Sequence, residues 1–301
     1  MKELRRTLTT WKLRTRTLEL GRRTLVMGVV NITPDSFSDG GKFFSAESAI
    51  THGISLLEEG ADILDLGAES TRPGSKAGGE DAAVDAGEEQ ERLLPVLRGI
   101  LAARPEAIVS IDTYKAETAR MALAEGAEIV NDVSGFLWDS AMARVCAEAG
   151  CGVVLMHTRG RPEEWKTQAQ ILPNELLATV RAGLEASLER AWSEGIAPDS
   201  IVLDPGYGFG KRLGENFALL ARQAELLDLE LPLLAGVSRK SFLGNALAHL
   251  YGGRSAPVEE RETASLAALT TAILHGASVV RVHRVREARE AAAVVDLVLE
   301  N

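Results

Sequence analysis

Short apolar runs alternate with amphipathic stretches along most of the chain. The runs are rich in Val, Ile and Leu and occupy residues 24–31, 63–69, 108–112, 129–135, 152–157, 201–206, 233–238 and 278–283. Runs that are apolar on both faces are typical of parallel strands covered by helices. Between them, residues such as Val180, Leu184 and Leu188 recur at helical spacing. About eight strand–helix units in a chain of this length predict an α/β fold, the (β/α)8 TIM barrel.

An open doubly wound sheet is the main alternative to the barrel, but its usual G-x-G-x-x-G loop after the first strand is missing. Barrels also reach a length of 301 residues as a single domain. We therefore expect an N-terminal extension over residues 1–23 and one barrel domain over residues 24–301. The extension is rich in Arg and Thr, as transit peptides are. Its partial alternation and central Gly favour a β-hairpin instead.

Composition narrows the functional class. The chain is 46% hydrophobic and 25% charged, as soluble globular proteins are, and it has no apolar run long enough to cross a membrane. A net charge of −10 disfavours nucleic acid as a general partner. Cys146 and Cys151 lack the spacing of a metal site, so we expect buried free thiols and a cytoplasmic location.

Polar residues stand at the end of nearly every predicted strand. A lone Asp in that position is more often a helix N-cap than a catalyst. The ends of barrel strands converge on one rim, however, and the active sites of barrel enzymes lie there. The residues concerned are Asn31, Glu69 to Arg72, Asp112, Asn131, Asp132, Met156, His157, Asp204, Ser238 to Ser241, Arg281 and His283.

These residue types suggest a ligand with two different ends. Asp112, Asn131 and Asp204 provide acceptors, which suit the amino and ring N–H groups of a flat heterocycle. The cations that suit a phosphate-like group at the other end are Arg72, Arg281 and His283, with Arg239 and Lys240 as further candidates. Asn31 is a hard neutral oxygen donor that could hold a Mg²⁺ ion which keeps most of its waters.

Several motifs occur in order along the chain, each at the end of its own strand. They are NITPDSFSDGG, ESTRPG, SIDTYK, IVNDVSG, LMH, LDPGYGFGK, GVSRKSFLG and RVH. Together they resemble the dihydropteroate synthase family, from about Thr24 to the C-terminus. The resemblance implies a transferase of folate biosynthesis that joins 6-hydroxymethyl-7,8-dihydropterin pyrophosphate to p-aminobenzoate, and it implies a homodimer.

The resemblance also implies roles for matched residues. The pterin edge would meet Asp112, Asn131, Asp204 and Lys240, and its faces would meet Val133, Met156, Phe209 and Gly236. The pyrophosphate would meet Asn31 through Mg²⁺, Arg281 and His283. The residues framing p-aminobenzoate, and therefore sulfonamides, would be Thr71, Pro73, Phe209, Lys240 and Ser241. Asp35 and Phe37 lie in a first loop that closes with the second loop in the family, and the residues implied in catalysis are Asp35, Thr71, Arg72, Lys240, Arg281 and His283.

The substrates suggest a mechanism. An aromatic amine is a weak nucleophile that is already neutral at pH 7, so the demanding step is the departure of pyrophosphate. We expect a dissociative, SN1-like reaction in which cations stabilise the leaving group and loop closure excludes water. Gly40 and Gly41 permit the backbone conformations that such a loop needs.

The chain departs from the family pattern at Arg284, at Ala68 and in a second loop that is long and acidic. These departures affect the expected loop closure and none of the matched pterin contacts. Three other functions are compatible with parts of the pattern. They are a methyltetrahydrofolate–corrinoid methyltransferase, a class I aldolase with Lys240 as its Schiff-base amine, and a non-catalytic pterin-binding module.

Overall fold

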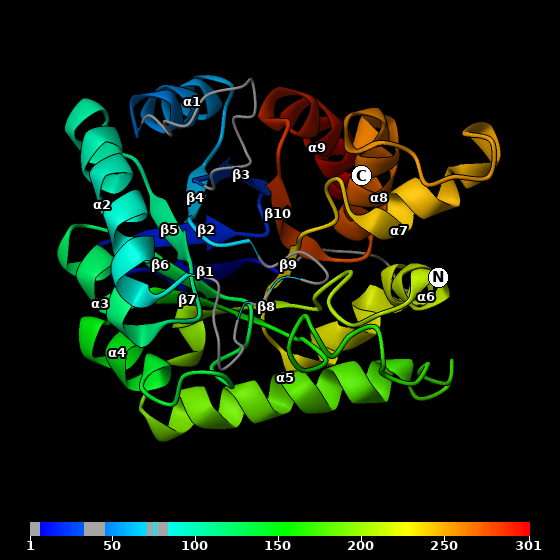
Figure 1. Cartoon of the computed structure of the whole chain (residues 1–301), viewed down its shortest axis with the longest axis horizontal. Coiled ribbons are helices and arrows are strands. Elements are labelled where there is room, and N and C mark those ends of the chain that lie inside the picture. Colours follow the sequence, from blue (N-terminus) through cyan, green and yellow to red (C-terminus); the bar gives the residue numbers. More distant parts are fainter. Residues whose placement is uncertain (1–6, 33–45, 71–74, 76, 78–83) are drawn as a thin grey trace.

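Eight parallel strands close into a barrel in the computed structural model, which describes residues 7–32, 46–70, 75, 77 and 84–301 (Figure 1). The strands follow one another around the barrel in chain order, and the last, β10, pairs with the first, β3. They are β3 (Leu25–Asn31), β4 (Ile63–Gly67), β5 (Val109–Asp112), β6 (Ile129–Asp132), β7 (Gly152–Met156), β8 (Ile201–Asp204), β9 (Leu233–Ala235) and β10 (Ala277–Val282). The predicted TIM barrel is confirmed.

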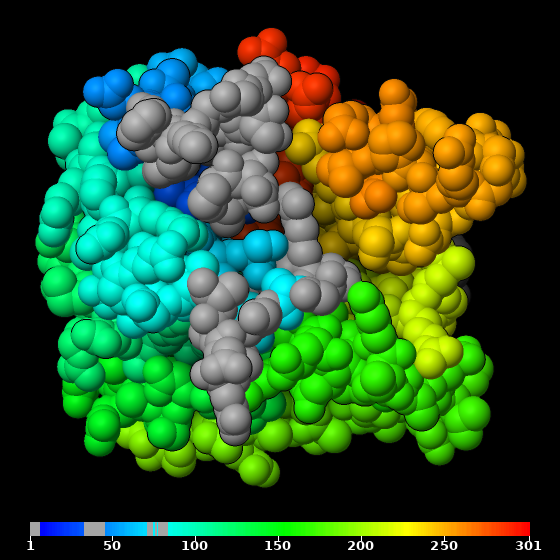
Figure 2. All heavy atoms as spheres, viewed as in Figure 1, coloured from blue at the N-terminus to red at the C-terminus, as the bar shows by residue number. Residues whose placement is uncertain are grey.

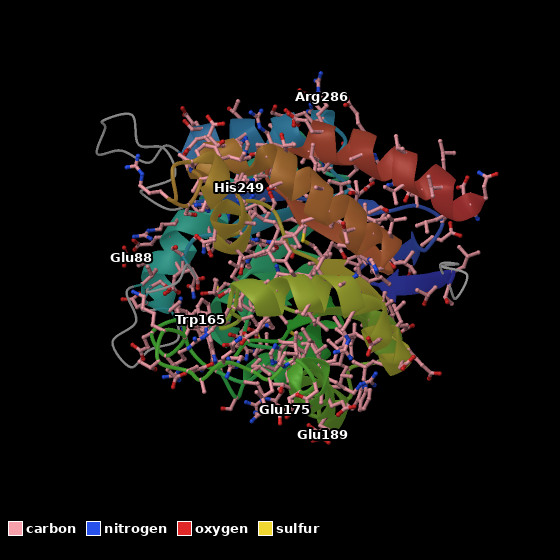
Figure 3. The ribbon with its side chains drawn as sticks, turned by 90° about the vertical axis from the view of Figure 1, so that its right-hand side faces the viewer. Glu88, Trp165, Glu175, Glu189, His249 and Arg286 are labelled. Atoms are coloured by element: carbon pink, nitrogen blue, oxygen red, sulfur yellow. The ribbon has the colours of Figure 1, made fainter. Side chains whose placement is uncertain are left out.

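Helices surround the barrel. They are α1 (Ala46–Glu58), α2 (Ala86–Ala103), α3 (Ala116–Ala124), α4 (Met142–Ala149), α5 (Leu176–Ser193), α6 (Leu213–Arg222), α7 (Ser241–Ala246), α8 (Glu262–Leu274) and α9 (Val285–Glu300). Short 3₁₀ turns connect some of them, namely η2 (Pro198–Ser200), η3 (Gln223–Leu229), η4 (Ala248–Leu250) and η5 (Val258–Arg261). The segment around α7 and η4 projects from one side of the molecule (Figures 1 and 2). Exposed charged residues such as Glu189 and Arg286 lie on the outer faces of α5 and α9 (Figure 3).

Alternation along the strands divides the core into two layers. Outward residues such as Leu64, Leu66 and Val280 pack against the helices in the larger apolar cluster. Inward residues such as Met27 and Ile63 fill the barrel interior in a separate apolar cluster. Strands buried on both sides need apolar residues at nearly every position, which explains the continuous runs in the sequence.

The N-terminal hairpin closes the bottom of the barrel. Strands β1 (Thr9–Lys12) and β2 (Thr17–Leu20) pair antiparallel, as the sequence predicted. Trp11, Leu13 and Leu20 are fully buried in the same cluster as the inward barrel residues. The Trp11 indole also donates a hydrogen bond of 3.0 Å to the carbonyl of Ser200. The hairpin is therefore part of the barrel core, while the domain boundary at residue 23 stays a prediction.

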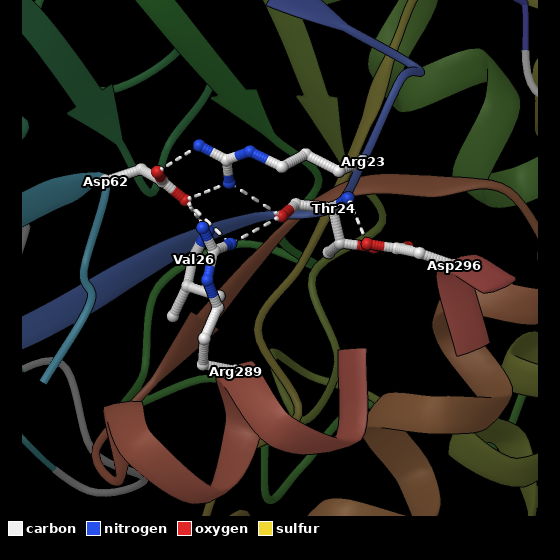
Figure 4. A network of polar contacts seen from close by, with 6 residues as sticks. All are labelled: Arg23, Thr24, Val26, Asp62, Arg289 and Asp296. Carbon is white, nitrogen blue, oxygen red and sulfur yellow. Dashed lines mark hydrogen bonds and ion pairs between the residues drawn. The ribbon is translucent and has the colours of Figure 1, made fainter. Parts of the chain in front are cut away.

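A polar network joins the last helix to the first barrel strand (Figure 4). The backbone N–H and hydroxyl of Thr24 donate to the Asp296 carboxylate on α9, at 2.9 and 2.7 Å. Arg23 pairs with Asp62 at 2.6 Å, and Arg289 of α9 reaches the same carboxylate at 3.3 Å. These contacts hold α9 at the seam where β10 closes on β3.

Within the described ranges, no helix is both long and apolar enough to cross a membrane. Cys146 and Cys151 are free and buried, as expected.

Removal of the Trp11 side chain should show how much the hairpin contributes to stability. We expect Trp11→Ala to lower the free energy of unfolding by about 3–5 kcal/mol, because it opens a cavity in the barrel core. Trp192→Ala is the matched control, since Trp192 is 50% exposed on α5 and should change stability by no more than about 0.5 kcal/mol. Urea unfolding followed by circular dichroism measures both. If Trp11→Ala and Trp192→Ala lower the free energy of unfolding equally, the hairpin covers the barrel without contributing to the stability of its core.

Candidate functional site

Above the apolar interior, the inward side chains at the carboxyl ends of the strands are polar. Asp65 on β4 is completely buried, and Asn131 on β6 and Asp204 on β8 are each 5% exposed. Arg281 on β10 is 20% exposed and Asp112 on β5 is 15% exposed at their side chains. The alternation of each strand aims these groups at the barrel axis, so five strands contribute to one polar floor.

The Arg281 guanidinium joins two acids from neighbouring strands. Its Nε donates to Oδ2 of Asp65 at 2.5 Å, and its Nη2 donates to Oδ2 of Asp112 at 2.6 Å. Burial alone would lower the pKa of Arg281, but the two carboxylates raise it above its ordinary value. Arg281 is therefore a fixed positive charge at the centre of the site.

The acids of the floor are strongly affected by burial. Burial, together with the charge of the neighbouring Asp65, raises the pKa of Asp112 to about 7, although the charge of Arg281 opposes this. Burial also raises the pKa of Asp204, although the backbone N–H of Gly206 donates to its Oδ1 at 2.7 Å and favours the carboxylate. A ligand that donates hydrogen bonds to these acids would compensate this cost.

A buried lysine orders the loop after β8. Lys211 is 7% exposed and its Nζ donates to the carbonyls of Gly206, His157 and Phe209, at 2.7, 3.3 and 3.3 Å. Burial lowers the pKa of Lys211 to about 7, and nearby Asp204 opposes this effect. These three hydrogen bonds fix the loop that carries Phe209 beside the polar floor.

Lys240 follows β9 and faces the same floor. Its Nζ lies 4.0 Å from the centre of the Phe209 ring, a distance typical of a cation–π contact. Burial and the charge of Arg281 lower the pKa of Lys240 to about 8, while Asp204 and Asp112 raise it. A Cβ at Gly236 would lie 3.6 Å from Oδ2 of Asp204 and 3.9 Å from Cβ of Arg281. Glycine at this position therefore keeps open the space between the acid and the arginine.

An apolar wall stands beside the polar floor. Val133 follows β6 and Met156 ends β7. They form one buried cluster with Ala77 and Tyr114, and Trp138 and Phe209 pack against it. Tyr114 and Trp138 meet edge to face, with ring centres 5.1 Å apart. Flat apolar and aromatic surfaces of this kind suit the faces of a planar ring.

The segment after β9 separates its two neighbouring cations. Lys240 faces the floor, whereas Arg239 pairs with Glu262 on α8 through a hydrogen bond of 2.5 Å. Arg239 has a left-handed backbone with φ of 59°, and this turn directs the two consecutive side chains differently. Arg239 is thus held by Glu262 rather than directed to the anion end that the sequence suggested. His283 lies at the end of β10, where its Nδ1 is 2.9 Å from the Ser238 hydroxyl.

The remaining candidates occupy the margin of the described site or lie outside it. Asn31 is half-buried at the end of β3, and Ser241 is exposed at the start of α7. Asp35, Phe37, Thr71, Arg72 and Pro73 lie outside the described residues, so their roles stay predictions. At the acidic start of α2, Asp85 accepts a hydrogen bond from the N–H of Glu88 at 2.8 Å.

Sequence reasoning missed several residues that support the site. Asp65 had a visible signal, since an acid in the middle of the apolar run ILDLG needs a partner. Ser238 stood among the polar residues expected at the rim, and Lys211 lay within a quoted motif, but neither was assigned a role. Lys115 ends the quoted motif SIDTYK, but its pairing with Glu69 and its distance of 3.4 Å from Glu89 could not be foreseen, because these partners come from distant segments.

The arrangement can bind a planar molecule with hydrogen-bond donors on its edge and an anion attached to it. The edge would meet acceptors at the floor, the ring faces would meet the apolar wall, and the anion would meet Arg281 and His283. Over the described part of the chain, no three His, Cys, Asp or Glu side chains lie close enough to form a metal site by themselves.

Comparison with known proteins places the chain among pterin-binding enzymes. A family model described as "Pterin binding enzyme" matches residues 27–283. The dihydropteroate synthase of Mycobacterium leprae is 45% identical over 272 residues, which are 90% of this chain and 92% of that protein.

Two solved structures have the same fold. The Xanthomonas albilineans dihydropteroate synthase with 4-aminobenzoic acid has a TM-score of 0.84 and 37% identity, and the match covers 97% of this chain and 98% of that one. The Yersinia pestis dihydropteroate synthase in complex with a sulfonamide drug has a TM-score of 0.85 and 36% identity, with 97% and 99% covered.

The raised pKa of Asp112 should affect stability in a defined direction. Its pKa is about 7 in the folded protein and about 3.9 in an unfolded chain. Between these values the folded state holds a proton that the unfolded state has lost, so this group destabilises the fold as pH rises. The free energy of unfolding of wild type should therefore fall relative to Asp112→Asn between about pH 4 and pH 7, by at most about 1.4 kcal/mol per pH unit. Urea unfolding at several pH values measures this, and parallel curves would show that Asp112 is ionised throughout.

Proposed function

Since the chain belongs to the dihydropteroate synthase family of pterin-binding enzymes, we propose that its barrel mouth joins 6-hydroxymethyl-7,8-dihydropterin pyrophosphate to p-aminobenzoate. The chain is a transferase that makes dihydropteroate. The observation that carries the proposal is the combination, at one end of the barrel, of buried acceptors with an apolar wall and a paired arginine. An aldolase would also use a lysine of lowered pKa such as Lys240, but it would not need the acceptor set.

The pterin edge lies against the polar floor in this proposal. Asp112 and Asp204 accept hydrogen bonds from ring and amino N–H groups, and the Asn131 amide presents its oxygen beside them. Burial raises the pKa values of Asp112 and Asp204, and N–H donors of a bound ring would favour their carboxylate forms. Val133 and Met156 provide the apolar surface for one face of the ring.

The reaction breaks the bond between the exocyclic carbon of the pterin and the bridging oxygen of the pyrophosphate. The bonding electrons leave with the pyrophosphate, whose growing charge Arg281 and His283 stabilise. The cationic carbon is stabilised by the pterin ring. The amine nitrogen then forms the new C–N bond and loses one proton, and water must be kept from the carbon meanwhile.

A Mg²⁺ ion fits the anion end of the site. Mg²⁺ prefers one or two protein oxygens together with substrate phosphates and waters. The half-buried Asn31 offers one such oxygen at the end of β3, and its side chain is free of hydrogen bonds to the described residues. When bound there, Mg²⁺ would supply charge stabilisation to the departing pyrophosphate.

The amine substrate would lie between the Phe209 ring and the start of α7. The exposed Ser241 hydroxyl, together with its backbone N–H, can meet the carboxylate of p-aminobenzoate. Lys240 lies beside it, over the Phe209 ring. A sulfonamide places its sulfonyl group in the position of this carboxylate, so we propose that sulfonamides compete with the substrate here.

A homodimer in the cytosol is also part of the proposal. Val294, Leu297 and Val298 on α9 are each more than 60% exposed, at 64%, 61% and 63%. Their spacing places them on one helix face, and an exposed apolar stripe of this kind suits a subunit contact. The buried free thiols of Cys146 and Cys151 fit a reducing compartment.

Asp204→Asn should weaken binding of the pterin substrate much more than binding of p-aminobenzoate. The amide still accepts from Gly206, but it can turn an N–H toward the donors of the pterin. Loss of a buried charged hydrogen bond corresponds to about a 10- to 150-fold weaker pterin affinity. Calorimetry and a dihydropteroate formation assay measure both substrates. A variant with unchanged pterin affinity would remove Asp204 from the pterin site, and an inactive wild type would refute the proposed reaction.

Asn31→Ala tests the proposed metal site. We expect the Mg²⁺ concentration for half-maximal activity to rise about tenfold, because one direct oxygen ligand is lost. The Michaelis constant for p-aminobenzoate should stay within about twofold. Steady-state kinetics at varied Mg²⁺ measures both values. A Mg²⁺ dependence like that of wild type would place the ion elsewhere.

A further inference from the structure

One buried oxygen atom holds two residues of the proposed site. Oδ2 of Asp65 accepts from Nε of Arg281 at 2.5 Å and from Nδ2 of Asn131 at 3.1 Å. The Asp65 side chain is completely buried, so it cannot touch a ligand itself without displacing these two residues. Its other oxygen, Oδ1, finds no hydrogen-bond partner among the described residues.

These two hydrogen bonds leave the ligand-binding groups of Arg281 and Asn131 available. Asp65 takes the Nε–H of Arg281 and Asp112 takes one Nη2–H, so three of the five N–H donors of a guanidinium remain. Donation of Nδ2 to Asp65 fixes the amide orientation of Asn131, so its oxygen is the group left to accept from a ligand. The first partner belongs to the anion end and the second to the pterin edge.

We propose that Asp65 is a positioning residue that orients the anion-binding guanidinium of Arg281 and the pterin-reading amide of Asn131 through a single shared oxygen. This inference rests on the proposed function and adds to it a group that couples the two ends of the substrate site. A carboxylate with one unpartnered buried oxygen is costly for the fold. Its position here is explained by the orientation of two ligand-binding groups.

The effect of Asp65→Asn on pyrophosphate binding distinguishes a positioning role from a purely electrostatic one. Asp65→Asn removes a negative charge beside Arg281, so a purely electrostatic role predicts tighter binding of an anion. A positioning role predicts weaker binding, because the guanidinium loses its charged acceptor at Nε and is free to turn. The two hypotheses therefore predict opposite signs for one measurement.

The experiment measures binding of Mg²⁺-pyrophosphate and of 6-hydroxymethylpterin by calorimetry, in the full-length wild type and in Asp65→Asn. We expect both dissociation constants to rise about tenfold or more in the variant. Glu128→Gln is the matched control, since Glu128 is a carboxylate that is 3% exposed, accepts from Thr15 at 2.8 Å and lies before β6 at the other end of the barrel. It should leave both constants within about twofold.

A double-mutant cycle with Asn131→Ala gives a second test that a general loss of stability would not satisfy. Asp65 should act on the pterin through Asn131, so the two substitutions should be non-additive for 6-hydroxymethylpterin. Asp65 should act on the anion through Arg281 and not through Asn131, so the two substitutions should be nearly additive for pyrophosphate binding. Additivity for both ligands would overturn the proposal.

Tighter or unchanged pyrophosphate binding in Asp65→Asn would also overturn it, provided that circular dichroism shows a folded variant. If Asp65→Asn does not fold, Asp65→Glu replaces it, because the longer side chain keeps the charge but moves the oxygen and should weaken both ligands similarly. Dihydropteroate formation by wild type is assayed in parallel. An active wild type with an unaffected variant refutes only the role of Asp65, whereas an inactive wild type refutes the proposed function.

Discussion

The positions of the other groups in the site depend on the contact between the Asp65 carboxylate and the Arg281 guanidinium. Charges buried at the centre of a barrel cost several kcal/mol each unless they are paired. Arg281 satisfies this requirement by meeting both Asp65 and Asp112, at 2.5 and 2.6 Å. The same pairing connects β10 with β4 and β5 across the barrel mouth, so one guanidinium aligns groups from three strands. The local order of the site therefore follows from the need to neutralise its charges.

The scaffold makes such a charged floor possible. Below it, the barrel is filled by apolar side chains and closed by the hairpin through Trp11 and Leu20. At the seam, Thr24 and Asp296 hold α9 against the first barrel strand. Close packing leaves little freedom to the strand ends above, and a barrel of this kind can hold buried charges in fixed positions.

The strand order and the polar strand ends could be predicted from the sequence because they depend on local periodicity. Asp112, Asn131 and Asp204 were identified in this way, each as a polar residue within or at the end of one apolar run. Side-chain pairing across the barrel could not be predicted, since spacing does not tell how far Arg281 reaches toward β4 and β5. The side chains of Arg239 and Lys240 point in different directions because Arg239 has a left-handed backbone. This conformation is uncommon for residues other than glycine, so it could not be predicted from the sequence.

The charges of the polar floor explain why a single ligand would stabilise its acids and its cations at the same time. Burial raises the pKa values of Asp112 and Asp204 and lowers that of Lys240, so both signs of charge are disfavoured there without a partner. A neutral ring that donates to the acids stabilises their carboxylate forms. An attached anion stabilises the cations in the same event. Because Arg281 contacts Asp112 directly, an anion bound to Arg281 changes the electrostatic surroundings of the acid that would meet the ring, so we expect binding of the two halves of the substrate to be coupled.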